Sequence, residues 1–262
     1  IETIKNSYSV DPMIYTVDAT GKLAKVNPNN LFTSIYGSSM FSSYSSFASI
    51  YSQMIDNKES LDKSYDMLAG HWPEKYDEMV IVLSEPNTIS DLLVYSLGLR
   101  DTKELTDMVT KIMSGEKVEI NNEPMTLTYE DLMNVKLKLI RPTDTYKYNS
   151  RYDIYEDMNE NEEYMQSLYD NAIQLKIVGV VSAKEGTTSM ALNPGVAYTS
   201  ELIDYIIGYS ANTDIVKKQL EDDEIDVFSG SRFDSKTNNL DLNFTDLVSI
   251  DTNKLQSAFN IN

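Results

Sequence analysis

Cysteine is absent from this chain of 262 residues, and histidine occurs only once, at His71. Without cysteine the chain has no thiol nucleophile, no disulfide and no thiolate zinc site. A single imidazole cannot supply a histidine-rich metal site. A Ser-His-Asp triad would need His71, yet this residue lies in a Gly-His-Trp-Pro segment, and the chain contains no nucleophile-elbow motif. We therefore predict no catalytic residue, no metal and no cofactor, and we interpret His71 as a loop or structural residue.

A glycine-rich phosphate-binding loop is also missing. Gly37, Gly70 and Gly230 stand alone, and neither Gly-Lys-Ser nor Gly-Lys-Thr occurs. If this protein works with ATP, we expect the nucleotide to bind to another domain or polypeptide.

Long apolar runs are absent as well. No stretch of about twenty apolar residues occurs, so we expect no membrane span within the chain. The first five residues, Ile-Glu-Thr-Ile-Lys, have neither the basic head nor the apolar core of a signal peptide. We interpret the chain as a piece of a longer protein. Both a domain from between membrane spans and a trimmed lipoprotein fit this interpretation.

Positive charge is scarce, since 22 Lys and Arg face 41 Asp and Glu, giving a formal net charge of -19. Such a surface repels nucleic acids and anionic lipid headgroups, so we expect neither as a partner. Basic proteins, cationic peptides and divalent ions remain compatible, although an acidic surface that keeps the protein soluble is the simpler interpretation. The acidic run at residues 221–226 lacks the spacing of a calcium loop, which favours a solvated linker and leaves calcium binding open.

Alternating and continuous apolar patterns predict the strands of a sheet. The clearest alternation is at residues 173–181, where Ile173, Leu175 and Ile177 share one parity. The apolar run at 78–83 predicts a strand that is buried on both faces. The remaining predicted strands are a hairpin over 12–26, with its turn at Asp18-Ala19-Thr20-Gly21, and a short strand over 135–139.

Cap residues and apolar spacing predict the helices. Thr199 is expected to cap a helix with an apolar stripe, and Thr88 with Asp91 forms a variant of the capping box. Gly98 is a natural residue to end the second of these helices. The other predicted helices are at residues 101–115, 128–133 and 165–172. Strands that alternate in part with helices predict an α+β fold, a mixed sheet with helices packed on it.

A Ser-rich and aromatic segment at residues 31–55 has apolar residues at spacings of four, three, four and three, which predicts one helical face. Its members are Met40, Tyr44, Phe47, Tyr51 and Met54. Most such stripes pack on their own core. A face rich in Met and aromatics also suits contact with a partner or ligand, so both interpretations stand.

Two groups of short motifs resemble the extracytoplasmic domain of MacB/FtsX-type ABC transporter permeases. The first is LxGxxP followed by (D/E)xVV(V/L), to which Leu68-Ala69-Gly70-His71-Trp72-Pro73 and Glu78-Met79-Val80-Ile81-Val82-Leu83 correspond, with Ile81 in place of the second Val. The second is (I/V)VGVV followed by G(V/I)xYT and a helix, which matches residues 177–181 and 195–199. The matches cover about a quarter of the chain.

The resemblance implies a domain organisation. The chain, 1–262, would be a single extracytoplasmic unit with a porter-like βαβ core formed by residues 68–98 and 165–209. Residues 99–164 would form an inserted or peripheral, more irregular subdomain, and residues 210–262 an acidic polar C-terminal segment.

The resemblance also implies a function without catalysis. The domain would lie on the outer face of a Gram-positive cell membrane, tethered by transmembrane helices of the same protein. There it would couple the motion driven by a cytoplasmic ATPase to export, sensing or activation of a peptide, lipid or surface protein. The alternative is a secreted or lipid-anchored binding protein whose Tyr-rich segment, residues 144–163, contacts a ligand. A surface hydrolase is the least favoured reading, because the sequence marks no pair of carboxylates for acid and base work.

Overall fold

The computed structural model describes residues 8, 10–27, 50–86, 88–104, 107, 111, 125–187 and 190–233. The chain divides into two compact units. Unit 1 comprises Ile1–Lys147 and Asp157–Thr213, and unit 2 comprises Tyr148–Glu156 and Asp214–Asn262. The fold is α+β, as predicted, with a mixed sheet and several helices. No helix within the described ranges is long and apolar enough to cross a membrane.

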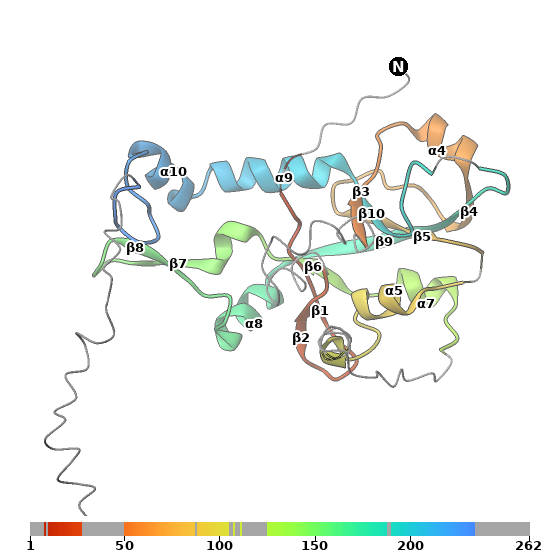
Figure 1. The fold of residues 1–262 in the computed structure, drawn as a ribbon, viewed down its shortest axis with the longest axis horizontal. Helices are drawn as coiled ribbons and strands as arrows, with labels where there is room; N and C mark the ends of the chain where they lie inside the picture. Colours follow the sequence, from red (N-terminus) through yellow and green to blue (C-terminus); the bar gives the residue numbers. More distant parts are fainter. Residues whose placement is uncertain are drawn as a thin grey trace, which may run out of the picture. The chain divides into compact units, whose positions relative to one another are not determined.

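Unit 1 is built on one mixed sheet, which has eight strands within the described part of the chain, in the order β2-β1-β6-β9-β5-β10-β3 with β4 paired to β9 (Figure 1). β9 lies parallel to β5 and antiparallel to β4 and β6, and β10 lies parallel to β3. The strands are β1 (Ile14–Val17), β2 (Leu23–Lys25), β3 (Tyr51–Gln53), β4 (Tyr65–Gly70), β5 (Glu78–Leu83), β6 (Leu137–Leu139), β9 (Ile173–Ala183) and β10 (Gly195–Tyr198).

β9 holds the sheet together because it pairs with three strands. Its first half has the predicted alternation, with Leu175 and Ile177 buried and Gln174 and Lys176 exposed. Its second half lies between β4 and β5 and is buried on both faces. The prediction that strands 79–83 and 173–181 belong to one sheet is confirmed, since β5 and β9 are direct neighbours.

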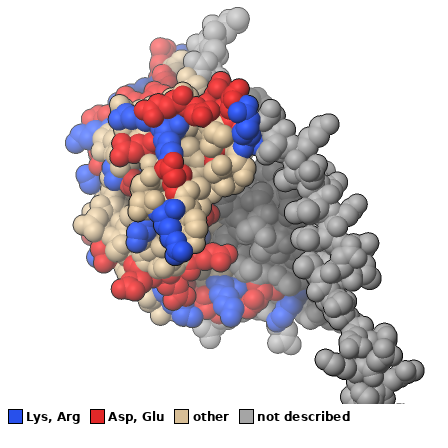
Figure 2. Space-filling view, turned by 90° about the vertical axis from the view of Figure 1, so that its left-hand side faces the viewer, with Lys and Arg blue, Asp and Glu red and all other residues tan. Residues whose placement is uncertain are grey.

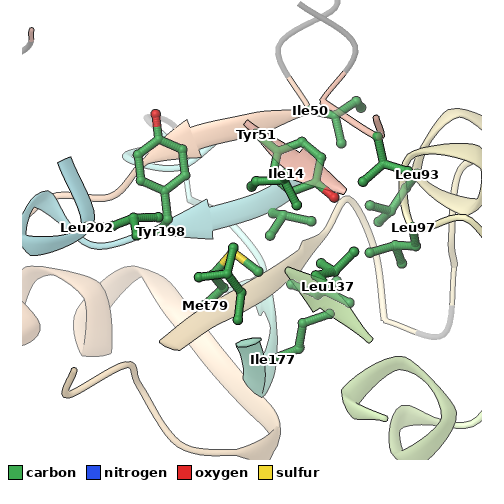
Figure 3. Close-up of a cluster of buried hydrophobic side chains, with 14 of the residues drawn as sticks. Ile14, Ile50, Tyr51, Met79, Leu93, Leu97, Leu137, Ile177, Tyr198 and Leu202 are labelled. Atoms are coloured by element: carbon green, nitrogen blue, oxygen red, sulfur yellow. The ribbon is translucent and has the colours of Figure 1, made fainter. Parts of the chain in front are cut away.

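Core side chains cover both faces of the sheet. On β5, Met79 and Ile81 belong to one apolar cluster, and Val80 and Val82 belong to another. Alternate residues of a strand point to opposite faces, so β5 links the two clusters. The larger cluster also contains Leu93 and Leu97 from α5 (Asp91–Ser96) and its C-cap, Leu132 of α7 (Tyr129–Met133), and Leu202 and Ile206 of α9 (Ser200–Ala211). Figure 3 shows Leu93, Leu97 and Leu202 among the side chains of this cluster.

The helices of unit 1 are α4 (Lys58–Ser64), α5 (Asp91–Ser96), α7 (Tyr129–Met133), α8 (Glu162–Asp170) and α9 (Ser200–Ala211), with a 3-10 turn, η1, at Pro142–Thr145. The predicted cap at Thr199 is confirmed, since its hydroxyl accepts from Leu202 N, and the helix predicted at 128–133 begins with a capping box of Thr128 and Asp131. The predicted cap of α5 at Thr88 is wrong, because the side chain of Ser90 accepts the Leu93 N–H instead. Gly98 follows the end of α5 with a φ of 71°, as expected for this position.

The helix predicted for the stripe is wrong at the two stripe residues that the structure describes. Tyr51 lies in β3 and Met54 directly follows that strand, so neither is helical. Strand pairing with β10 outweighs the helical spacing. Met40, Tyr44 and Phe47 lie outside the described residues, as do the apolar residues predicted for the helix at 101–115.

Residues 99–164, predicted as a more irregular insert with a strand at 135–139, contain that strand as β6 and also a hairpin that was not predicted. β6 joins the main sheet next to β1 and β9, and residues 146–157 form a hairpin of β7 (Tyr146–Asn149) and β8 (Ile154–Asp157). Helix α4 and strand β4 were not predicted either, because their sequence has no periodic apolar pattern.

Unit 2 contains the hairpin tip, α10 (Asp214–Glu221) and the loop to Phe233. At the tip, Asp153 has a φ of 57°, accepts a hydrogen bond of 2.6 Å from the Tyr148 hydroxyl and forms an ion pair with Lys218 of α10. The acidic run follows α10. Within it, Asp226 accepts hydrogen bonds from Phe228 N and the Ser229 hydroxyl, so this carboxylate caps its own turn.

Candidate functional site

The two groups of motif residues meet at the pairing of β4 with β9. Gly70 lies opposite Gly179, and a Cβ on Gly70 would lie 2.0 Å from the Val178 carbonyl oxygen. A Cβ on Gly179 would lie 2.4 Å from the His71 carbonyl oxygen. The backbones pass so closely that neither position accepts a side chain without movement. This is the physical reason for the glycine in each motif.

The loop after β4, residues 71–77, is fixed by hydrogen bonds at both ends. His71 N donates a hydrogen bond of 2.9 Å to the Val178 carbonyl oxygen. At the other end, Glu78, the acidic residue of the first motif, accepts a hydrogen bond of 2.8 Å from Glu74 N. The His71 imidazole is exposed, consistent with its interpretation as a loop residue.

Trp72 anchors the middle of the loop. Its indole N–H donates a hydrogen bond of 2.7 Å to Asp62 of α4, and its ring meets Tyr65 edge-on at a centroid distance of 6.3 Å. The side chain is buried in the smaller apolar cluster. The loop therefore has a fixed position relative to α4 and the sheet.

A crevice of about 390 Å³ opens beside this loop, at the carboxyl ends of the parallel strands β3 and β10. We call it the β3/β10 crevice. Three segments line it: the end of β3 and the start of α4, the loop after β4, and the start of α9. Its lining residues are Met54, Ile55, Asp56, Asn57, Lys58, Leu61, Trp72, Pro73, Glu74, Thr199, Ser200 and Glu201.

Hydrogen bonds join the first and third segments of the lining. Met54 N donates to the Tyr198 carbonyl oxygen at 2.8 Å, which extends the pairing of the two strands to their ends. The Ser200 hydroxyl donates to the Asp56 carboxylate at 2.8 Å. Both strands pass directly into helix starts, so the crevice lies where ligands bind in open sheets with parallel strands.

The lining of the crevice combines apolar and charged side chains. Five of its twelve lining residues are apolar, and the other seven are polar or charged. Met54, Leu61 and Trp72 are buried there, whereas Asp56, Glu74, Glu201 and Lys58 are exposed at the rim. Apolar side chains with polar groups among them are typical of ligand sites.

Of the predicted contact residues, only Met54 lines the crevice. Tyr51 is buried, with 2% of its surface exposed, and its hydroxyl donates a hydrogen bond of 2.7 Å to the Ser96 carbonyl oxygen. Burial raises the pKa of the Tyr51 phenol far above its usual range, so the donor proton is retained. Figure 3 shows its ring within the larger cluster. Tyr51 is thus a core residue and not a contact surface.

Sequence reasoning missed most of the crevice. Trp72 and Pro73 were noted only as motif residues, and Glu74 and Glu201 were assigned no role. A signal was present, because a strand that leads directly into a helix cap occurs at both Tyr198-Thr199 and the segment after Gln53. The parallel pairing of these two strands could not be read from the sequence.

A second feature is the exposed aromatic surface of unit 2. Large apolar side chains are exposed there by 47 to 75%: Tyr148, Tyr152, Leu220, Phe228 and Phe233. Acidic and basic residues are interspersed around uncharged areas on the face that Figure 2 shows. We call the four aromatic residues of this set the unit 2 aromatic surface. Single exposed apolar residues are ordinary, but several in one small unit are typical of a contact surface.

Comparison with known proteins gave no match: no family model, no curated protein and no solved structure matches this chain.

Proposed function

We propose that this chain is an extracellular domain of a MacB/FtsX-like ABC transporter permease from a Gram-positive bacterium. In this proposal the domain does no chemistry. It transmits motion between transmembrane helices of the same protein, driven by a cytoplasmic ATPase, and a peptide, lipid or surface protein outside the cell.

The observation that carries the proposal is the assembly of the motif residues. The segments at 68–83 and 177–199 are far apart in the sequence, yet Gly70 lies opposite Gly179 and β5 lies beside β9. β10 and α9 follow in the same sheet and core. The two motif groups thus lie together in one sheet, as a porter-like core would require. This assembly supports the family resemblance, and the function follows from the resemblance.

Cysteine labelling tests the location that the proposal requires. The chain has no native cysteine, so a single introduced thiol is a specific probe. Ser84 is exposed and Ser182 is 1% exposed, and both are close in size to cysteine. In intact cells that make the complete gene product, a membrane-impermeant maleimide should label Ser84→Cys but not Ser182→Cys. Both should react after denaturation.

Fractionation of the labelled cells tests the tether and the partner. The labelled protein should stay in the membrane fraction and should purify in detergent with a polypeptide that hydrolyses ATP. If Ser84→Cys were labelled only after the cells are lysed, the extracellular location would be contradicted. Absence of an ATPase from the purified complex would contradict the transporter.

The unit 2 aromatic surface favours a second candidate, a secreted or lipid-anchored binding protein. Exposed Tyr and Phe side chains on an acidic unit suit recognition of a ligand without any transporter. Release of the labelled protein into the medium, or its removal from membranes by a lipoprotein-cleaving treatment, would favour this candidate.

A further inference from the structure

We propose that the β3/β10 crevice binds a basic side chain, arginine or lysine, presented on an apolar segment of a polypeptide. This inference does not depend on the transporter proposal, since it rests only on the lining of the crevice. It assigns a ligand class to a site that the sequence motifs alone do not define.

Charge selects a cation. Three carboxylates and one ammonium line the crevice, so its net charge is -2. Neither Glu74 nor Glu201 forms an ion pair with any residue that the structure describes, and both are exposed. The whole chain adds to the selection, because its net charge of -19 attracts cations and repels anions.

The apolar part of the lining selects a ligand with an apolar body. Ile55 and Pro73 are partly exposed and supply apolar surface beside the acidic residues, whereas Met54, Leu61 and Trp72 are buried and expose 6% or less. An arginine or lysine has this division within one side chain, an aliphatic stem that packs on apolar surface and a charged head that stays in water. A small inorganic cation would leave this apolar surface unused.

The size of the crevice favours a peptide over a free cation. A volume of about 390 Å³ lies at the lower end of the range for small-molecule sites and exceeds what a guanidinium group alone fills. The crevice also opens to the surface, so a neighbouring apolar residue of the same peptide can cover Ile55 and Pro73. We therefore assign the ligand to a polypeptide.

Binding can be tested with two blocked dipeptides, acetyl-Leu-Arg-amide and acetyl-Leu-citrulline-amide. Citrulline keeps the shape of arginine and removes its charge. Calorimetry at low salt measures affinity, and the fluorescence of Trp72, the sole tryptophan, reports whether binding occurs at the crevice. The arginine peptide should bind saturably and change Trp72 emission, and the citrulline peptide should bind at least several-fold more weakly. Added salt should lower the affinity of the arginine peptide but not that of the citrulline peptide.

Charge variants locate the site. Glu74→Gln and Glu201→Gln should each lower the affinity for the arginine peptide about two- to five-fold, as expected for partly exposed ion pairs. Lys58→Gln should raise this affinity by a similar factor. Glu130→Gln, an exposed carboxylate on α7 outside the crevice lining, is the matched control and should leave affinity unchanged.

Three results would overturn the inference. Equal affinity for the arginine and citrulline peptides would remove the role of charge. Binding that is indifferent to Glu74→Gln and Glu201→Gln, or that leaves Trp72 emission unchanged, would place the ligand elsewhere. Butylguanidine, a monocation that carries the guanidinium and an aliphatic stem without a peptide, should bind more weakly than the dipeptide, and equal affinity would identify a free cation as the ligand instead.

Discussion

Asp18, in the turn between β1 and β2, shows how one buried carboxylate joins two distant segments. One of its oxygens accepts hydrogen bonds from Thr20 N, the Thr20 hydroxyl and Lys22 N, and the other accepts from Thr102 N and its hydroxyl. Burial alone would raise the pKa of Asp18, but these hydrogen bonds outweigh it and hold the pKa below its usual range. The charged form is therefore the one that stabilises the fold.

Asp18→Asn should lower the free energy of unfolding at pH 7 by about 1.5–3 kcal/mol, because an amide oxygen cannot replace a charged acceptor of several donors. The folded pKa lies below the unfolded pKa of about 3.9, so the stabilisation is present above that pH and is lost as the pH falls through the folded pKa. Urea unfolding at pH 7 and at low pH should show the difference between wild type and variant shrinking on acidification. Asp66→Asn, at an exposed position, is the control and should show little difference at either pH.

Substitutions of Tyr51 test whether this residue of the predicted contact stripe belongs to the core. Tyr51→Phe should lower the free energy of unfolding by about 1–2 kcal/mol, because the buried Ser96 carbonyl oxygen loses its donor. Tyr51→Ala should lower it by about 3–5 kcal/mol, since a buried ring is removed. Thermal melts measure both. Unchanged melting of Tyr51→Ala would restore the partner-surface interpretation for this residue.

At the scale of elements, the close pairing of β4 with β9 depends on glycine. Gly179→Ala should lower the free energy of unfolding by about 1–3 kcal/mol, because the new Cβ would lie 2.4 Å from the His71 carbonyl oxygen and force the loop to move. Trp72 follows His71, so its emission maximum should shift. Chemical unfolding followed by fluorescence measures both effects.

Gly208→Ala is the matched control, because Gly208 lies on α9 and an added Cβ would have no neighbour within 4 Å among the described residues. This variant should be about 0.5–1 kcal/mol more stable, as alanine is the better helix former. If Gly179→Ala were as stable as Gly208→Ala, the account of the motif glycines would be wrong.

Another element-scale cluster fixes α9. The Arg141 guanidinium lies 3.7 Å from the centroid of the Tyr209 ring, and both side chains bond to the Asp144 carboxylate. Asp144 lies in η1, so the segment after β6 is joined to the last turns of α9. Sequence spacing gave no indication of this cluster, since its members lie up to 68 residues apart.

At the scale of the whole molecule, β5 contributes side chains to both apolar clusters of unit 1, so we expect the two faces of the sheet to unfold together. Ile81 faces the larger apolar cluster, whereas Trp72 lies in the smaller cluster on the other face of the sheet. Ile81→Ala should lower the free energy of unfolding by about 2–5 kcal/mol, because Ile81 is fully buried. Circular dichroism and Trp72 fluorescence should report the same lowered midpoint. A Trp72 transition that stayed at the wild-type midpoint would mean that the two faces unfold separately.

Tyr152→Ser is the control for this prediction. Tyr152 is 60% exposed on unit 2, so its replacement should change stability by no more than about 0.5 kcal/mol. A large loss of stability in this variant would show that the unit 2 aromatic surface is part of a core and not a contact surface.

The sequence by itself determined the elements whose signals are local. Apolar alternation located the first half of β9, and continuous apolarity located β5, because burial of a strand dictates its side chains directly. Thr199 and Thr128 located helix starts because a cap acts within a few residues. The absence of cysteine and of multiple histidines restricted the chemistry without any structure.

Only the tertiary structure decided the features that depend on partners far along the chain. Tyr51 has helical spacing with Met54, but pairing with β10 makes its segment a strand, because a hydrogen-bonded neighbour outweighs a weak local preference. Likewise, the need for glycine at Gly70 and Gly179 is evident only once the close approach of the β4 and β9 backbones is known. The β3/β10 crevice exists because three segments, each unremarkable alone, end at one edge of the sheet. Neither its acidic rim nor its apolar lining can be assigned before that edge is known.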